Sequence, residues 1–178
     1  MGVIKNFLLT SFCFVLFSHV LWGQEEVLWQ ADKRLYWKDF KGKVPSGAGA
    51  AATTASGISY QFSTNHKNGK MFVDYEVSAF FYPTKSWYKP KICNEVTLVH
   101  EQLHFDISEL FARRMRKKMA ETQFTKNIKA EVKVIYRKTL KNLNDFQNRY
   151  DNETDYSRNV PQQKVWIQKI EKALNESE

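Results

Sequence analysis

The stretch Cys93–Lys118 reads CNEVTLVHEQLHFDISELFARRMRKK, and the rest of the chain is best understood around it. It contains the pattern HExxH, with histidines at positions 100 and 104 and a glutamate at position 101. Residues four apart on a helix lie on the same face, one turn above the other. In a helix, His100 and His104 can therefore bind a single metal ion, with Glu101 beside them.

The spacing of apolar residues predicts that this stretch is a long helix. Asn94 is a suitable N-cap, and Glu95 suits the first turn. Both histidines fall on or beside an apolar stripe of roughly helical period, so the ligand face is expected to point inward, toward a core or cleft. That stripe comprises Val96, Leu103, Ile107 and Phe111.

The chain has 178 residues, of which 43% are hydrophobic and 15% aromatic, which is the size and composition of one globular domain. Residues 1–23 are typical of a signal peptide, because Lys5 precedes an apolar run from Phe7 to Leu21. The alternative, a retained membrane anchor, is disfavoured by the shortness and polar residues of the run. We therefore expect an exported protein, periplasmic or secreted, with a single domain at 24–178 and no integral membrane segment after cleavage.

Removal of the signal peptide would leave Cys93 as the single cysteine, so the fold must rely on its core rather than on a disulfide. We expect Cys93 to be a small packing side chain. The net charge of +8 raises the question of a nucleic-acid partner. However, a cluster of cations lies at the end of the motif helix, where it suits the helix dipole and a solvated face. We therefore expect no nucleic-acid binding.

The elements on either side of the motif predict an α+β fold. Ala55–Ser63 and Lys70–Tyr82 are predicted strands joined by a short polar turn, which indicates an antiparallel hairpin. A second long helix is expected from after Ala120 to about Tyr150, and a short last helix from Pro161. A small N-terminal antiparallel sheet followed by the HExxH helix and further C-terminal helices is an α+β order rather than a parallel α/β order.

The residue types at the motif suit zinc and hydrolysis. Neutral imidazoles of His100 and His104 are ligands that Zn²⁺ accepts in a tetrahedral site. Catalytic zinc lowers the pKa of a water molecule, and Glu101 would take that water's proton as general base and pass it to the leaving amine. The hypothesis is a zinc-dependent metalloendopeptidase, with a peptide or protein substrate paired along the Lys70–Tyr82 strand. The alternative is a pair of helix histidines satisfied by hydrogen bonds.

A third protein ligand is needed, and the residues alone leave it open. The expected mature chain has one other histidine, His66, in the hairpin turn. Glu109 lies about 140° round the helix from His104 and is poorly aimed, as is Asp106. The polar turn YDNETDYSRN at 150–159 offers oxygen donors, although a solvated turn with capping carboxylates is the ordinary interpretation. These donors are Asp151, Glu153, Asp155 and Tyr156.

Several motifs together are similar to those of a known family. They are LYWKDFKG at 35–42, Ser86-Trp87, HEQLHFDISELFARRMRKK from His100, and YDNETDY at 150–156 followed by Gln163 and Trp166. In these motifs the chain resembles an uncharacterised bacterial family of predicted secreted zinc-dependent proteases. The resemblance implies a zincin-like α+β fold, zinc ligands at His100 and His104, and a catalytic Glu101.

The same resemblance bears on the third ligand, near the end of the chain. Relatives often carry a histidine at the position of Tyr156, where it looks like a third ligand. The resemblance thus implies Tyr156 as the third ligand here, with Asp155 as the alternative. Tyrosine binds zinc less readily than histidine, which leaves a second function open: a catalytically silent, zincin-fold binding or scaffold protein of the cell envelope.

Overall fold

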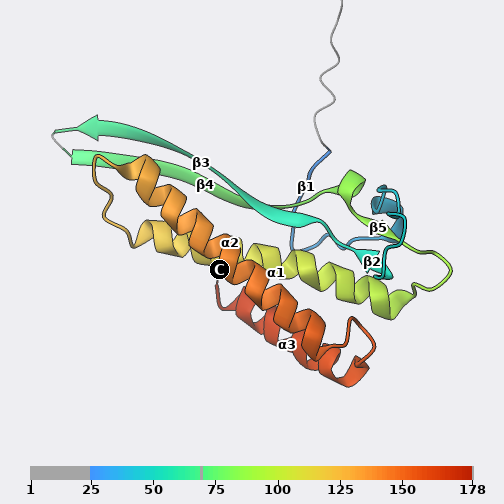
Figure 1. Cartoon of the computed structure of the whole chain (residues 1–178). Coiled ribbons are helices and arrows are strands. Elements are labelled where there is room, and N and C mark those ends of the chain that lie inside the picture. Colours follow the sequence, from blue (N-terminus) through green and yellow to red (C-terminus); the bar gives the residue numbers. More distant parts are fainter. Residues whose placement is uncertain (1–24, 69, 178) are drawn as a thin grey trace, which may run out of the picture.

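The computed structural model describes residues 25–68 and 70–177, so the predicted signal peptide lies outside the described residues. Strands come first and long helices follow, which confirms the predicted α+β class (Figure 1). None of the helices in the described part of the chain has the length and apolar character needed to cross a membrane. The elements are β1 (Val27–Leu28), the 3₁₀ helix η1 (Trp37–Asp39), β2 (Ala52–Thr53), β3 (Ser56–Lys67), β4 (Lys70–Phe81), the 3₁₀ helix η2 (Pro83–Lys85), β5 (Trp87–Tyr88), α1 (Glu95–Ala120), α2 (Ile128–Glu153) and α3 (Val160–Asn175).

The predicted hairpin is present and longer than expected. β3 and β4 pair antiparallel along their full lengths, from Ser56 opposite Phe81 to Lys67 opposite Lys70. β3 thus continues four residues beyond the predicted end, because each further residue finds a partner on β4. Asn68, in the connection, has a φ of 53°, the left-handed conformation that two-residue hairpin turns use.

Two sheets lie against α1. β1 pairs with β4 at Phe80 and Phe81, giving the order β1-β4-β3, and β2 pairs with β5 in a separate two-stranded sheet. At this end β4 is a central strand with a neighbour on each side. The prediction that the Lys70–Tyr82 strand pairs with a substrate is therefore wrong for the end of β4 that reaches β1.

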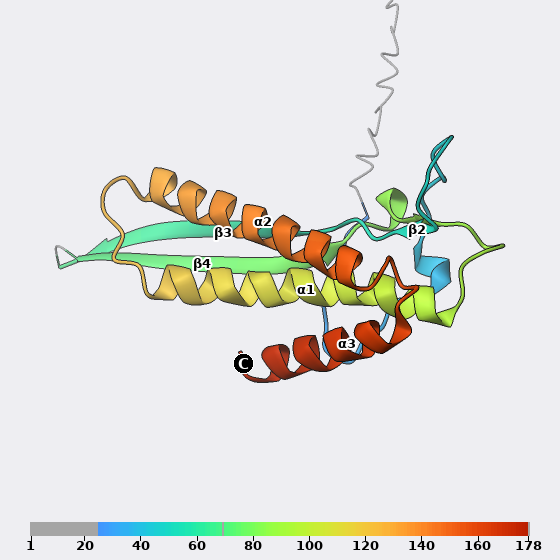
Figure 2. The ribbon, with the colours of Figure 1, turned by 60° about the horizontal axis from the view of Figure 1, so that its bottom comes forward.

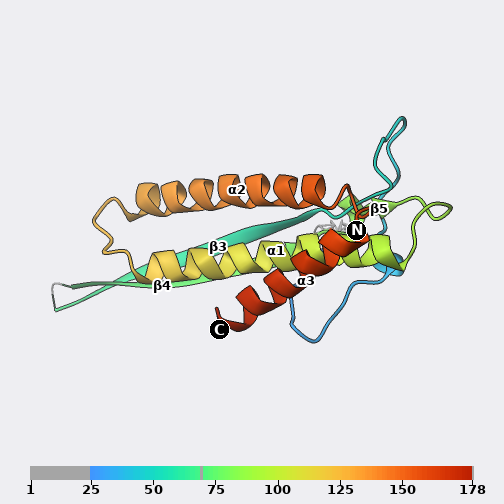
Figure 3. The same cartoon turned by 90° about the horizontal axis from the view of Figure 1, so that it is seen from below.

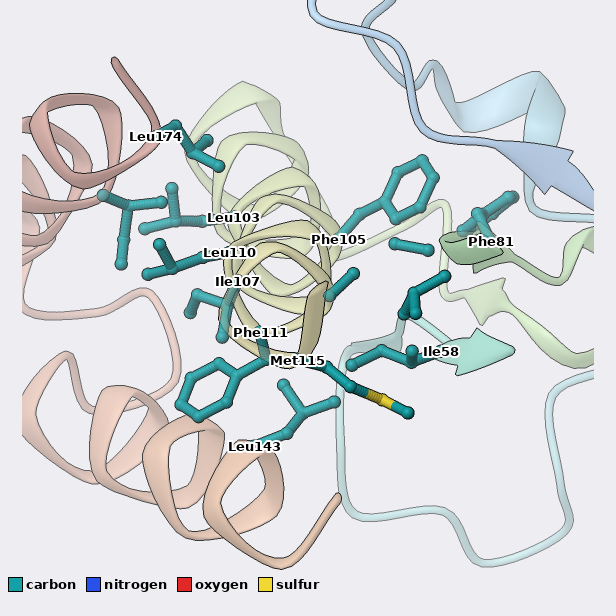
Figure 4. Packing of buried hydrophobic residues seen from close by; sticks show 14 of the residues in the cluster. Ile58, Phe81, Leu103, Phe105, Ile107, Leu110, Phe111, Met115, Leu143 and Leu174 are labelled. Atoms are coloured by element: carbon teal, nitrogen blue, oxygen red, sulfur yellow. The ribbon is translucent and has the colours of Figure 1, made fainter. Parts of the chain in front are cut away.

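Helix α1 is the central element, which Figure 2 shows running between α2, α3 and the hairpin. Seen down its axis in Figure 4, Phe105 points toward the sheet, where Phe81 lies, while Leu110 and Phe111 point toward the other helices. Its residues from His100 to Ala112 are buried except His104, so the helix is covered on nearly all sides. A helix enclosed in this way holds its polar side chains in fixed surroundings.

The other two helices differ from the prediction mainly at their ends. α2 begins at Ile128, later than expected, where Glu131 accepts hydrogen bonds from the backbone N–H and the hydroxyl of Thr125. It continues to Glu153, beyond the expected end near Tyr150. α3 has the predicted proline in its first turn, and it packs beside α1 (Figure 3). Its predicted apolar face is buried, comprising Trp166, Ile170 and Leu174.

Candidate metal centre

Three donor atoms from two helices converge at one point. Asp151, in the last turn of α2, places Oδ1 3.0 Å from Nε2 of His100 and 2.9 Å from Nε2 of His104. The two Nε2 atoms are 3.3 Å apart. Ligand atoms of a tetrahedral zinc site are separated by about 3.3 Å, given zinc–ligand bonds of about 2 Å. The His₂Asp donor set therefore fits a zinc ion in both chemistry and spacing.

Tyr150 fixes the planes of both imidazoles. Its ring is fully buried, stacks on His100 with centroids 4.5 Å apart, and meets the ring of His104 edge-on at 5.2 Å. Its hydroxyl donates to the backbone carbonyl of His100 at 3.3 Å. Burial, with the charges of Glu101 and Asp151 adding to it, raises the pKa of Tyr150 far above its ordinary value, so the phenol stays neutral. Tyr150 is a support for the histidines rather than a ligand.

Gln163, from α3, sets the tautomer of His100. Nδ1 of His100 lies 3.2 Å from Oε1 of Gln163, and both side chains are buried. The amide nitrogen of Gln163 donates to the carbonyl of Val96 at 3.0 Å, which leaves Oε1 as the acceptor. His100 must then carry its proton on Nδ1, so its Nε2 lone pair faces His104 and Asp151. Metal-binding histidines are usually oriented by such a partner on the other ring nitrogen.

The electrostatics of the cluster favour a cation between the side chains. Burial alone would raise the pKa of Asp151, but hydrogen bonds from His100 and His104 and their charges lower it well below its usual range. Burial would likewise lower the pKa of His104, but the hydrogen bond to Asp151 and the charges of Glu101 and Asp151 raise it overall. A carboxylate held ionised between two imidazoles provides one negative and two neutral donors when the histidines are deprotonated.

Glu101 lies next to these donors with an unsatisfied oxygen. The residue is 5% exposed, and its Oε2 is buried without a hydrogen-bond partner among the described residues. A buried carboxylate oxygen without a partner is costly, so its retention calls for a missing partner such as water or a substrate group. Thr54, just after β2, donates to the backbone carbonyl of Glu101 at 3.0 Å and so places this segment beside the motif.

The structure does not bring Tyr156 or Asp155 to the histidines. Tyr156, predicted as the third ligand, is 57% exposed, and the exposed carboxylate of Asp155 pairs with Arg158. Because α2 extends to Glu153, the predicted turn contributes only Asp151 to the cluster. Once α2 is known to continue past Tyr150, Asp151 falls eight residues after Leu143, at the edge of the face that α2 buries.

The turn after α2 reverses the chain within a few residues. Asp155, Tyr156 and Ser157 have φ values of 48°, 51° and 77°, which is unusual for three consecutive residues other than glycine. Backbone hydrogen bonds hold the turn, from the N–H of Tyr156 to Asp151 at 2.9 Å and from that of Asn159 to Thr154 at 2.8 Å. This reversal brings α3, and with it Gln163, back against α1.

The remaining candidates have other partners or positions. Cys93 is half-buried and donates to the carbonyl of Ala51 at 3.3 Å, and burial raises the pKa of its thiol. Asp106 accepts hydrogen bonds from Trp29 and Gln102, and Glu109 forms ion pairs with arginines of α1. These two carboxylates are thus occupied away from the histidines. His66 lies opposite Met71 near the tip of the hairpin.

Residues 91–158 match the model of a family described as "Bacterial protein of unknown function (DUF922)". The matched stretch includes His100, Glu101, His104 and Asp151, whereas Gln163 lies beyond it. This agrees with the expectation of an uncharacterised bacterial family, and the description names neither a metal nor an activity. No curated protein and no solved structure shows a significant match to the chain.

Proposed function

We propose that the protein is a zinc-dependent peptidase of zincin-like fold. The observation that carries the proposal is the unpartnered, buried Oε2 of Glu101, one residue after the first of two histidines that converge with Asp151. A carboxylate in this position has no structural partner in the described residues, yet it lies where a general base for hydrolysis is needed. A metal site without such a base would fit storage or structure; this arrangement fits catalysis better.

The roles of the side chains follow from their contacts. His100, His104 and Asp151 would hold the ion through Nε2, Nε2 and Oδ1. When bound, zinc supplies Lewis acidity and lowers the pKa of water toward neutrality. Glu101 would accept a proton from the attacking water at Oε2 and return it to the leaving amine. Gln163 and Tyr150 would keep the His100 ring in the orientation and tautomer that binding requires.

The two-stranded sheet is the better candidate for binding an extended peptide. β2 pairs with β5 along one edge, so within the described residues its other edge has no strand beside it. The hydrogen bond from Thr54 to the carbonyl of Glu101 holds the end of β2 against the motif. A peptide that adds to this edge would run past Glu101, with main-chain hydrogen bonds supplying affinity.

Export belongs to the same proposal, because the predicted signal peptide at 1–23 directs the protein out of the cytoplasm. A zinc peptidase in the periplasm or outside the cell would meet peptides and unfolded proteins as substrates.

The test uses the chain from residue 24 to the end, purified without chelators. We expect about one zinc per chain and hydrolysis of peptides from a broad library. Glu101→Gln should retain the zinc and lose activity by at least about a hundredfold, because the base is gone. The matched control is Glu95→Gln, an exposed glutamate of the same helix, which should leave both properties unchanged.

Two outcomes would overturn the proposal in different ways. Wild-type protein that binds no zinc removes the metal site itself. If the zinc-loaded protein cleaves nothing in the library and Glu101→Gln behaves like wild type, the protein binds zinc in the cell envelope without catalysing a reaction. The presence of Tyr156 no longer favours that second function, because Asp151 takes the position beside the histidines.

A further inference from the structure

A groove lies between α1 and α2, away from the candidate metal centre. α3 covers only part of α1: its Leu174, near its end, accepts a hydrogen bond from Arg113 at 2.6 Å, and α1 continues beyond this point to Ala120. Figure 3 shows α1 and α2 running side by side past the end of α3. The groove has a volume of about 670 Å³, within the range of sites that bind small molecules. Its lining residues are Phe111, Arg114, Lys118, Val134, Ile135, Lys138, Thr139, Asn142, Asp145, Phe146 and Arg149.

Part of this lining is apolar. Phe111 is buried and meets Phe146 edge-on, with ring centroids 5.3 Å apart, while Ile135 is half-buried. Val134, on the wall, is 65% exposed. An alkyl chain laid along these side chains would remove both its own surface and theirs from water, which favours binding.

The walls of the groove are cationic and lack matching acids. Arg114 and Lys118 come from α1, and Lys138 comes from α2. No carboxylate of the described residues lies within ion-pair distance of these three side chains. The single acid of the lining, Asp145, pairs with Lys141.

Arg114 is held in place before any ligand binds. Its guanidinium lies over the ring of Phe111, 4.5 Å from the centroid, and within 5.7 Å of that of Phe146. Partial burial lowers the pKa of Arg114, although the residue stays exposed to solvent. A guanidinium presented in this way can bind a carboxylate or phosphate through two parallel hydrogen bonds.

The groove also lies in the part of the chain that carries its positive charge. Residues 110–150 contain twelve lysines and arginines and three acids, a net charge of +9, whereas the whole chain has +8. The rest of the sequence therefore sums to −1. A concentration of like charge on two neighbouring helices attracts anions and destabilises the folded state unless anions bind there.

We propose that the α1–α2 groove binds an anionic amphiphile with a single alkyl chain. Arg114, Lys118 and Lys138 contact its carboxylate or phosphate head, and the chain lies over Ile135 and Val134. A docked protein partner would need about 800 Å² of its surface, more than a groove of this size presents. Single-stranded nucleic acid would need free aromatic faces for base stacking, but guanidinium groups cover those of Phe111 and Phe146.

The test titrates dodecyl phosphate, below its micelle concentration, into the purified chain from residue 24 in a calorimeter. We expect one molecule bound per chain. Dodecyl maltoside, with the same chain and a neutral head, and inorganic phosphate, with no chain, should each bind at least about tenfold more weakly. Equal affinity for dodecyl phosphate and either of these compounds would overturn the proposal, as would no binding of dodecyl phosphate.

Two pairs of variants separate the groove from diffuse charge. Lys138→Gln should weaken dodecyl phosphate binding by about fivefold or more, whereas Lys133→Gln, an exposed lysine of α2 outside the lining, should change it less than about twofold. Val134→Asp should abolish binding, whereas Val165→Asp, an exposed valine of α3, should not. Equal effects within a pair would show that charge or apolar surface anywhere on the helices suffices, which contradicts a defined site.

Discussion

Oε1 of Gln163 lies 3.2 Å from Nδ1 of His100, although 63 residues separate the two in sequence. The same amide donates to Val96, one turn before His100 on α1, so it bridges α3 to two consecutive turns of the motif helix. Oε1 of Gln163 is thereby left as the acceptor for the Nδ1–H of His100, whose Nε2 faces Asp151. Helix α3 therefore contributes to the metal centre without supplying a ligand.

Gln163→Leu should weaken zinc binding by about tenfold to a hundredfold, because His100 loses the partner that fixes its tautomer and ring orientation. The measurement is the zinc dissociation constant from competition with a chromogenic chelator. Gln168→Leu, an exposed glutamine of α3, is the matched control and should leave the constant unchanged. Gln163→Glu keeps the acceptor and should retain most of the affinity. If this second variant binds zinc as weakly as Gln163→Leu, the loss comes from packing or from the missing donor to Val96 rather than from the hydrogen bond to His100.

Asp151→Asn should reduce zinc affinity by at least about a hundredfold, because a neutral amide oxygen replaces the anionic ligand between the histidines. Tyr156→Gly should leave zinc affinity unchanged. The removed phenol is 57% exposed, and glycine accepts the φ of 51° at that position without strain. Zinc content and affinity of the two proteins decide between the two ligands. Loss of zinc in Tyr156→Gly with retention in Asp151→Asn would reverse the assignment.

The sequence predicted the elements that depend on local pattern. The alternation along β4, the Asn94 cap and the apolar face of α3 all arise from neighbouring residues, and each appears as expected. The third donor was harder to predict from the sequence, because its identity depends on where α2 ends. A run of polar residues from Asp151 onward is typical of a turn, but packing of Tyr150 against His100 and Trp166 extends the helix through Asp151.

The hydrogen bond between Gln163 and His100 could not be predicted from the sequence, for a different reason. Glutamine on a short helix has no pattern that identifies its partner. Its role depends on the sharp reversal at Asp155–Ser157, which sets how α3 packs on α1. Tertiary packing decides such contacts, whereas periodicity reports only which face of a helix is buried.

The stability of the metal-free protein should peak in mildly acidic solution. Folding lowers the pKa of Asp151, so its contribution is present above the unfolded value of about 4 and is lost as the pH falls toward the folded value. Folding raises the pKa of His104, so its contribution is present below the unfolded value of about 6.5 and is lost as the pH rises through the folded value. The pair thus stabilises the metal-free fold most between about pH 4 and about pH 6.5.

Zinc should have the opposite pH dependence, since it binds neutral imidazoles and displaces their protons. The rise in melting temperature on adding zinc should therefore be larger at about pH 8 than at about pH 5. Calorimetric scans with and without zinc at both pH values measure this rise in melting temperature. Addition of magnesium, which prefers oxygen ligands, serves as the control and should have little effect. A zinc-induced rise of the same size at both pH values would argue against histidine ligands.

Two substitutions of Tyr150 separate the contribution of its hydrogen bond from that of its ring. Tyr150→Phe removes the donor to the carbonyl of His100 and should cost about 1 kcal/mol, or about 3 °C in melting temperature, with zinc affinity preserved. Tyr150→Ala also removes the ring that stacks on His100, and should cost about 3 to 5 kcal/mol and weaken zinc binding. Tyr136→Phe, whose hydroxyl donates to Ile58 at 3.0 Å in another part of the fold, controls for loss of a tyrosine hydrogen bond. If Tyr150→Ala remains folded and binds zinc as tightly as wild type, the ring does not position the histidines.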